Sequence, residues 1–263
     1  MPKTYHSCQK ILSYSHFVRN FNYENIGIMI LDSANYDNNY GEIILQEMSV
    51  SSDFARWTVE LSGSGLFGRV IEIGCGLGNN LDALNEQCTD LWASDHNEVY
   101  LRTVASEKKY LSGTIFWDIE KPPNIEEKFD SFFCSNVLEH IEDDENAMCN
   151  IAKIPNIKKG VIIVPANNHI YSRIDKNLGH YRRYDKKMLL NKLAGAGFKV
   201  LEMNSFNKIG TLGWIGQSMI LKRDTLGSRN MKVFDKLMPL IRRIDSFIPF
   251  PGLSLLAIVK KSS

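Results

Sequence analysis

The segment VIEIGCGLGNN, residues 70–80, constrains the fold of this chain more than any other segment. Its apolar start predicts a buried parallel strand, and the strand runs into a turn that contains Gly74, Gly76 and Gly78 before a helix opens. Glycines at such a turn let a ligand approach the backbone and permit positive φ angles. The segment therefore predicts a ligand-binding turn, with an ordinary glycine-rich connection as the alternative.

Length and charge narrow the class of protein. A chain of 263 residues can bury one large core with a small elaboration. Its formal net charge of +1 lacks the basic excess of a general nucleic-acid binder, so no nucleic-acid partner is expected. The five cysteines are scattered without a CxxC pair, which favours reduced thiols in a cytoplasmic protein. No apolar run approaches the roughly 20 residues of a spanning helix.

Strand and helix patterns alternate along most of the chain. Residues 1–52 are predicted to form an arm with helical pieces that covers the site, and residues 53–63 to form a helix. Apolar runs then predict further strands, separated by helical segments, near residues 91–95, 114–120, 131–134, 160–166, 200–204 and 253–261. This alternation predicts an α/β fold with a doubly wound sheet.

Two acids follow predicted strands. Asp95 stands 21 positions beyond Gly74, where a carboxylate in a nucleotide-binding fold accepts hydrogen bonds from ribose hydroxyls. The alternative is that Asp95 only caps a helix that begins near Asn97. Asp118 ends the third predicted strand, where it can accept an adenine amine or simply face water.

These features together resemble the class I S-adenosylmethionine-dependent methyltransferases, within the ubiquinone-biosynthesis-like group. The resemblance spans residues 54–200 and rests on EIGCGLG, Asp95, Asp118 and SNVLEHIEDD. It implies a Rossmann-like sheet of seven strands in the order 3-2-1-4-5-7-6, with strand 7 antiparallel. It also implies S-adenosylmethionine as the cofactor, S-adenosylhomocysteine as the product, no metal, and a methyltransferase domain over residues 53–263.

The resemblance assigns cofactor contacts residue by residue. Glu72 and the turn hold the methionine part, the acid after the second strand holds the ribose, and the acid after the third strand holds the adenine. Arg56 falls where some relatives bind the cofactor carboxylate, although it can equally be a solvated surface charge. The full predicted set is Arg56, Glu72, Gly74, Cys75, Gly76, Asp95, His96, Asp118, Ile119, Ser135 and Asn136.

A second resemblance lies further along the chain. The segment LGHYRRY, residues 178–184, is similar to one in bacterial methyltransferases that are sometimes joined to glycosyltransferases. It suggests a glycan-linked or small-molecule acceptor methylated on oxygen, less readily on nitrogen, without identifying that acceptor. Residues 165–185 are accordingly predicted to form an acceptor loop.

An alcohol acceptor must lose a proton, so a base is needed. His180 and His140 are the candidates, because histidine changes charge near neutral pH. His140 can instead pack against the sheet as a structural residue. Arginines bind anions and tyrosines offer a flat face with a hydroxyl, although a solvated basic turn paired with Asp175 and Asp185 is the alternative. The predicted substrate residues are His169, Tyr181, Arg182, Arg183 and Tyr184.

A helical insertion, residues 208–250, precedes the last strand. Helical patterns cover residues 211–222 and 231–247, and the second carries an apolar face. The sheet, a second copy of the chain or a membrane surface with a lipid-linked acceptor can cover that face. Three interpretations of the whole chain stay open: a small-molecule or glycan methyltransferase, an RNA or protein methyltransferase, and an inactive cofactor-binding scaffold or partner subunit.

Overall fold

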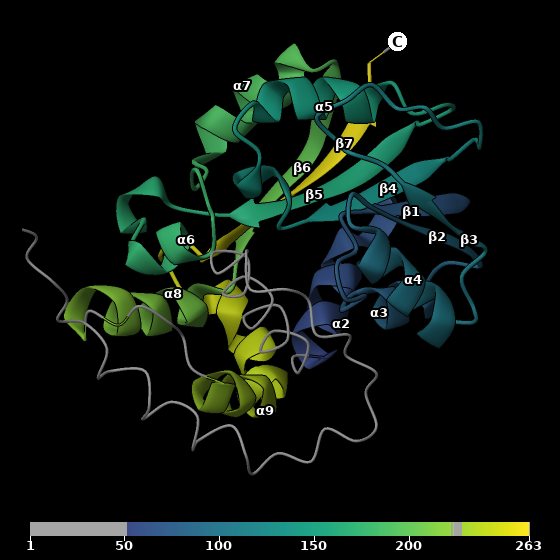
Figure 1. Cartoon of the computed structure of the whole chain (residues 1–263). Coiled ribbons are helices and arrows are strands. Elements are labelled where there is room, and N and C mark those ends of the chain that lie inside the picture. The colour runs from purple at the N-terminus through teal and green to yellow at the C-terminus, as the bar shows by residue number, and fades with distance from the viewer. Residues whose placement is uncertain (1–51, 222, 224–227, 263) are drawn as a thin grey trace, which may run out of the picture. The chain divides into compact units, whose positions relative to one another are not determined.

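The computed structural model describes residues 52–221, 223 and 228–262, which all belong to the unit Asn38–Ser263. The predicted arm and the helical pattern before residue 51 lie outside the described residues. The described chain is built on one seven-stranded sheet with helices on both faces (Figure 1). Its order is β3-β2-β1-β4-β5-β7-β6, and β7 is antiparallel to both neighbours, which confirms the predicted fold.

The strands follow the apolar runs closely, with one exception. The third strand ends at Phe116 and not near Asp118, because its partner β2 ends at Asp95, which pairs with Phe116. Asp118 therefore lies in the loop beyond the strand. The strands are β1 Arg69–Ile73, β2 Asp90–Asp95, β3 Gly113–Phe116, β4 Ser131–Ser135, β5 Lys159–Pro165, β6 Phe198–Phe206 and β7 Ser254–Lys261.

Alternate residues of the central strands enter two separate cores. In β5, Val161 and Ile163 face the core that also contains residues of α2, α3, α4 and α9, whereas Ile162 and Val164 face the core shared with α5 and α7. A central parallel strand needs an apolar residue at every position because both of its faces are covered. The helices are α2 Ser52–Ser62, α3 Leu81–Asn85, α4 Glu98–Glu107, α5 Asp144–Ala152, α6 Arg173–Asn177, α7 Lys186–Gly195, α8 Lys208–Ile215 and α9 Ser228–Ile244.

The insertion is closed by hydrogen bonds between its two ends. Asp245 is 3% exposed, and its carboxylate accepts from the backbone N–H groups of Asn207 and Lys208. The side chain of Asn207 accepts from the N–H of Gly210 and so starts α8 earlier than the predicted residue 211. Buried backbone donors are satisfied in this way, which holds the start and the end of the insertion together.

The apolar face of α9 is covered on one side only. Met238 and Ile241 are buried, and Arg242 forms an ion pair of 2.7 Å with Glu60 of α2. Four other apolar side chains of the predicted face stay 40–58% exposed, namely Val233, Leu237, Leu240 and Ile244. The described residues therefore bury one edge of this face and leave the rest open. Among the helices that the structure describes, none has the length and apolarity to cross a bilayer.

Candidate active site

The glycine turn is tied to the end of the neighbouring strand. The backbone N–H groups of Gly74 and Cys75 both donate to the carbonyl oxygen of Ser94, at 2.8 and 2.9 Å. Gly74 has φ +70°, and a Cβ at this position would lie 2.5 Å from Cγ2 of Val137. Gly76 also has a positive φ of 52°. Position 74 therefore requires glycine for conformation and for space.

Asp95 connects the glycine turn to the loop after β2. Its Oδ2 accepts from the N–H of Gly76 at 2.8 Å, and its Oδ1 accepts from the N–H of Asn97 at 2.9 Å. The N-cap of α4 is Asn97, whose own side chain accepts from the first turn. Asp95 thus is not the helix cap, and each carboxylate oxygen keeps further capacity to accept a hydrogen bond. His96 beside it is 78% exposed, with Nδ1 3.4 Å from Oδ1 of Asp95.

Glu72 is a buried carboxyl group at the same turn. Its Oε1 accepts from Nδ2 of Asn80 at 2.9 Å, and its Oε2 has no hydrogen-bond partner among the described residues. Burial raises the pKa of Glu72 to about 8; the nearby Asp95 adds to this rise and the hydrogen bond from Asn80 opposes it. Oε2 is therefore available to accept a hydrogen bond from a ligand donor.

Asp118 and Ile119 follow β3 in the loop. The Asp118 carboxylate is 32% exposed and lies 2.8 Å from Nζ of Lys121. The hydrogen bond from Lys121 holds the pKa of Asp118 below its ordinary value, so this carboxylate stays charged. Ile119 is 7% exposed, and its carbonyl oxygen accepts from Asn150 of α5.

Ser135 and Asn136 lie at the carboxyl end of β4. Both are partly buried, and Asn136 has φ +54°, a left-handed conformation that asparagine tolerates better than most residues. Its N–H donates to the carbonyl oxygen of Ile163 in β5, and its Nδ2 lies 3.3 Å from Oγ of Ser135. The parallel strands β1, β2, β3 and β4 thus all present polar groups at or just beyond their carboxyl ends, where ligands bind in such sheets.

Arg56 lies apart from these strand ends. Its side chain is 54% exposed and forms an ion pair of 2.6 Å with Glu86. It lines a groove of about 280 Å³ between α2 and the outer side of the glycine turn, together with Leu77 and Asn79. None of the strand-end acids lines this groove. The structure therefore brings Arg56 near the turn without joining it to the carboxylates.

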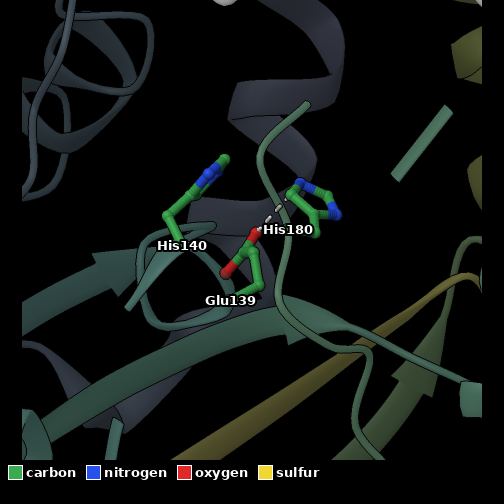
Figure 2. A group of neighbouring side chains, drawn as sticks. All are labelled: Glu139, His140 and His180. Carbon is green, nitrogen blue, oxygen red and sulfur yellow. Dashed lines mark ion pairs between the residues drawn. The ribbon is translucent and has the colours of Figure 1, made fainter. Parts of the chain in front are cut away.

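Three residues from two segments meet beyond β4 (Figure 2). Glu139 is fully buried, and neither of its carboxylate oxygens has a hydrogen-bond partner among the described residues. Nε2 of His180 lies 4.0 Å from Oε1 of Glu139, and the rings of His140 and His180 meet edge to face at 4.7 Å. Burial raises the pKa of Glu139 to about 7, although His180 opposes this. Desolvation of the ring, followed by the electrostatic effect of His180, lowers the pKa of His140. His140 nevertheless keeps exposed surface.

The loop of residues 165–185 holds His180 in place. Nδ1 of His180 lies 3.0 Å from Oδ1 of Asp175, a carboxylate that is fully buried. Arg183 is 1% exposed; its Nε donates to the same Oδ1 at 2.8 Å, and its guanidinium stacks on Trp214 at 4.1 Å. This predicted substrate residue therefore supports Asp175 from inside the protein.

The remaining predicted substrate residues divide into buried and exposed groups. Tyr184 is fully buried and donates to Asp144, and Arg182 donates to the carbonyl oxygens of residues 141 and 142. Tyr181, 54% exposed, and His169 remain open to solvent. Sequence analysis did not single out Glu139, and it named Asp175 only as a partner of the alternative basic turn, a pairing that Arg183 makes in the structure. For Glu139 the available signal was an acid placed directly between apolar Leu138 and a candidate base.

Comparison with known proteins bears on this arrangement. Residues 71–164, which contain the end of β1, all of β2, β3 and β4, and nearly all of β5, match the family model described as "Methyltransferase domain". This segment is a methyltransferase domain. The predicted enzyme class is confirmed at this level, and the family model covers both the glycine turn and the VLEH segment that ends in His140.

Solved structures share the fold of the methyltransferase domain at low sequence identity. One is an S-adenosylmethionine-dependent methyltransferase from Clostridium acetobutylicum, with TM-score 0.52, 14% identity, and coverage of 81% of this chain and 92% of that one. Another is a chain from a complex between the Haloferax volcanii Trm112 methyltransferase activator and a methyltransferase. It has TM-score 0.58 and 14% identity, with coverage of 89% of this chain and 100% of that one. A Bacillus halodurans structure described as a methyltransferase has TM-score 0.51, 16% identity, and coverage of 79% and 99%. No curated protein sequence matches the chain significantly.

Proposed function

We propose that the protein transfers a methyl group from S-adenosylmethionine to an oxygen atom of a small-molecule or glycan-linked acceptor. The observation that carries the cofactor assignment is the buried Glu72, with one unpartnered oxygen, beside a glycine turn that is hydrogen-bonded to Asp95. Bound S-adenosylmethionine supplies an electrophilic methyl group on sulfur and leaves as S-adenosylhomocysteine. The cationic amino acid moiety, the ribose and the adenine of the cofactor all carry hydrogen-bond donors, and the strand ends carry the hydrogen-bond acceptors that they need.

Each predicted cofactor contact has a role in this proposal. Glu72 accepts from the cofactor ammonium, while the backbone from Gly74 through Cys75 to Gly76 leaves room for the methionine part. Asp95, with His96 beside it, accepts from the ribose hydroxyls. The remaining contacts are Asp118 and Ile119 for the adenine, Ser135 and Asn136 beside the sulfonium, and Arg56 for the cofactor carboxylate.

The acceptor would enter over the loop of residues 165–185. His180 is the preferred group for holding the acceptor proton, because Asp175 fixes one ring nitrogen and leaves the other directed toward Glu139. His140, on the neighbouring segment, is the second candidate. Tyr181 and His169 are exposed and can contact the acceptor, whereas Arg182, Arg183 and Tyr184 shape the loop from below.

Two other functions compete with this proposal. The Haloferax volcanii structure pairs a methyltransferase with an activator protein, so a protein partner or an RNA or protein acceptor is the first competitor. An inactive cofactor-binding scaffold is the second, and it would bind the cofactor without any turnover. A cytoplasmic location, a homodimer and a membrane-surface contact through α9 remain part of the proposal, and none of these three features distinguishes the competitors.

Cofactor binding is the direct experiment. Isothermal titration with S-adenosylmethionine and S-adenosylhomocysteine should show one site, and Asp95→Ala should weaken binding by about 1–3 kcal/mol, the usual cost of leaving buried hydrogen-bonding groups unpaired. Asp90→Ala is the matched control, because Asp90 lies at the opposite end of the same strand and pairs with Arg69. No heat from either ligand would refute the proposal, and equal affinity of Asp95→Ala and the wild type would remove the ribose role.

A further inference from the structure

The cluster of Glu139, His140 and His180 has the composition of a metal site. One ligand atom from each residue lies within 4.8 Å of the other two. Figure 2 shows the Glu139 carboxylate pointing toward the imidazole of His180. The carboxylate is fully buried, and neither oxygen has a hydrogen-bond partner among the described residues. A buried carboxylate without a partner is costly, and a bound cation would remove that cost.

His180 is also oriented by a hydrogen bond on its other side. Nδ1 of His180 lies 3.0 Å from the buried Asp175 carboxylate, which leaves Nε2 as the ligand atom. The ring of His140 lies beside Gly179, and its Nδ1 is the atom nearest to where a Cβ of Gly179 would stand. Histidines that bind metals nearly always use their second nitrogen in this way, with a carboxylate or a backbone carbonyl as the partner. A buried carboxylate on the second nitrogen of His180 therefore matches the arrangement around a metal-binding histidine.

The two ligand segments are also held together by the backbone. The N–H of Tyr181 donates to the carbonyl oxygen of Glu139 at 2.8 Å, and the N–H of His180 donates to the carbonyl oxygen of Asp175 at 2.9 Å. Asp175 is itself fixed by Arg183 and by the N–H of Ser172 at 2.8 Å. The ligand atoms therefore sit on a frame that needs only small side-chain movements to close around an ion.

We infer that Glu139, His140 and His180 form a binding site for one divalent transition-metal ion. Two imidazoles and one carboxylate suit Zn²⁺, Fe²⁺, Co²⁺ or Mn²⁺, whereas Mg²⁺ and Ca²⁺ prefer oxygen ligands alone. Three protein ligands leave coordination positions open, as in catalytic metal sites. This inference replaces the sequence-based expectation of a metal-free protein.

The position of the site gives the ion a role, and this part rests on the proposed function. Glu139 follows the end of β4 by four residues, close to Ser135 and Asn136. With the ion bound, His180 would serve as a ligand and no longer as the base of the proposed function. An acceptor hydroxyl at an open coordination position would release its proton to solvent more easily, since the cation stabilises the alkoxide. The ion would then select acceptors that present a hydroxyl, and it would do so beside the methyl donor.

Metal binding can be measured without any turnover. The purified full-length protein is stripped with a chelator, and Co²⁺ is added while its visible absorption bands are recorded; Zn²⁺ then competes, and elemental analysis gives the stoichiometry. We expect one Co²⁺ per chain with bands typical of low coordination number, displaced by Zn²⁺. Absence of stoichiometric Co²⁺ and Zn²⁺ binding to the wild-type protein would overturn the inference, whatever the variants do.

Variants locate the ion. His180→Ala and Glu139→Gln should each weaken Co²⁺ binding by more than about 100-fold, because loss of a ligand costs more than the 10–100-fold of an outer partner. His169→Ala, an exposed histidine of the same loop, should leave binding unchanged. Wild-type affinity in both ligand variants would refute the site. Titration with S-adenosylmethionine is run in parallel, so that loss of the cofactor proposal and loss of the metal inference are separate outcomes.

Discussion

Replacement of Glu72 by glutamine tests whether this buried carboxyl group is neutral in the folded protein. Its pKa is about 8 in the folded state, against an ordinary value of 4.5 that we take for the unfolded state. Between these values the folded chain keeps a proton that the unfolded chain releases. The free energy of unfolding therefore falls as pH rises through this window, by about 1.4 kcal/mol per pH unit at the steepest.

The magnitude follows from the same two pKa values. Over the whole window Glu72 costs about 5 kcal/mol of stability, and between pH 6 and pH 9 the loss is about 3 kcal/mol. The side chain is 1% exposed, so solvent screening does not reduce this figure. Glutamine has no titrating proton and can still accept from Asn80 through its Oε1. Glu72→Gln should accordingly gain about 3 kcal/mol relative to the wild type across this range.

Urea unfolding of both cofactor-free proteins at pH 6, 7, 8 and 9 measures the difference. Titration of Glu139, the other buried carboxyl group with a raised pKa, cancels because it is common to both proteins. Glu86→Gln is the control, because Glu86 is 53% exposed and should follow the wild-type curve. Parallel curves for Glu72→Gln and the wild type would show that Glu72 is already charged in the folded state, and the reasoning would fail.

Two further predictions concern stability. Gly160→Ala places a Cβ against the ring of Phe132 and should lower the free energy of unfolding by about 1–3 kcal/mol. Gly195, at the end of α7, has open space around it, so Gly195→Ala should leave the free energy of unfolding unchanged or raise it by up to about 1 kcal/mol. An equal urea midpoint for the two variants would contradict this. Asp144→Asn should lower the free energy of unfolding by about 3 kcal/mol, because this buried carboxylate pairs with Lys192 and accepts a hydrogen bond from Tyr184. Tyr184→Phe removes only that hydrogen bond and should lower the free energy of unfolding by about 1 kcal/mol. Thermal unfolding of the two variants tests this ranking, and a lower melting temperature for Tyr184→Phe than for Asp144→Asn would refute it.

The strands of the sheet and the glycine turn were predictable from local sequence. Apolar runs such as residues 160–166 contain the information for a strand covered on both faces, because every side chain of such a strand must be apolar. The spacing of Gly74 and Asp95 is equally local in origin, since one helical crossover separates the two strand ends. The strand order was implied by the resemblance to class I methyltransferases, and the structure has that order.

Predictions failed where an element depends on a distant partner. The third strand was expected to reach Asp118, but its length is set by the end of β2. Arg183 was expected to face a ligand, and the structure places it inside the protein between Asp175 and Trp214. The end of β2 and Trp214 cannot be identified from spacing along the chain, whereas Asp175 was the partner expected for a solvated turn and not for a buried one.

Local sequence by itself determined the strands, the glycine turn and the acid at the tip of the second strand, because each depends on neighbours within one β-α unit. Only the tertiary structure decided that Glu139 and His140 meet His180, about 40 residues further along the chain. It also decided that the Glu139 carboxylate is buried with no hydrogen-bond partner in the part of the chain that the structure describes. Side chains from separate loops converge only after the sheet has aligned its strand ends, and no periodicity in the sequence records that distance.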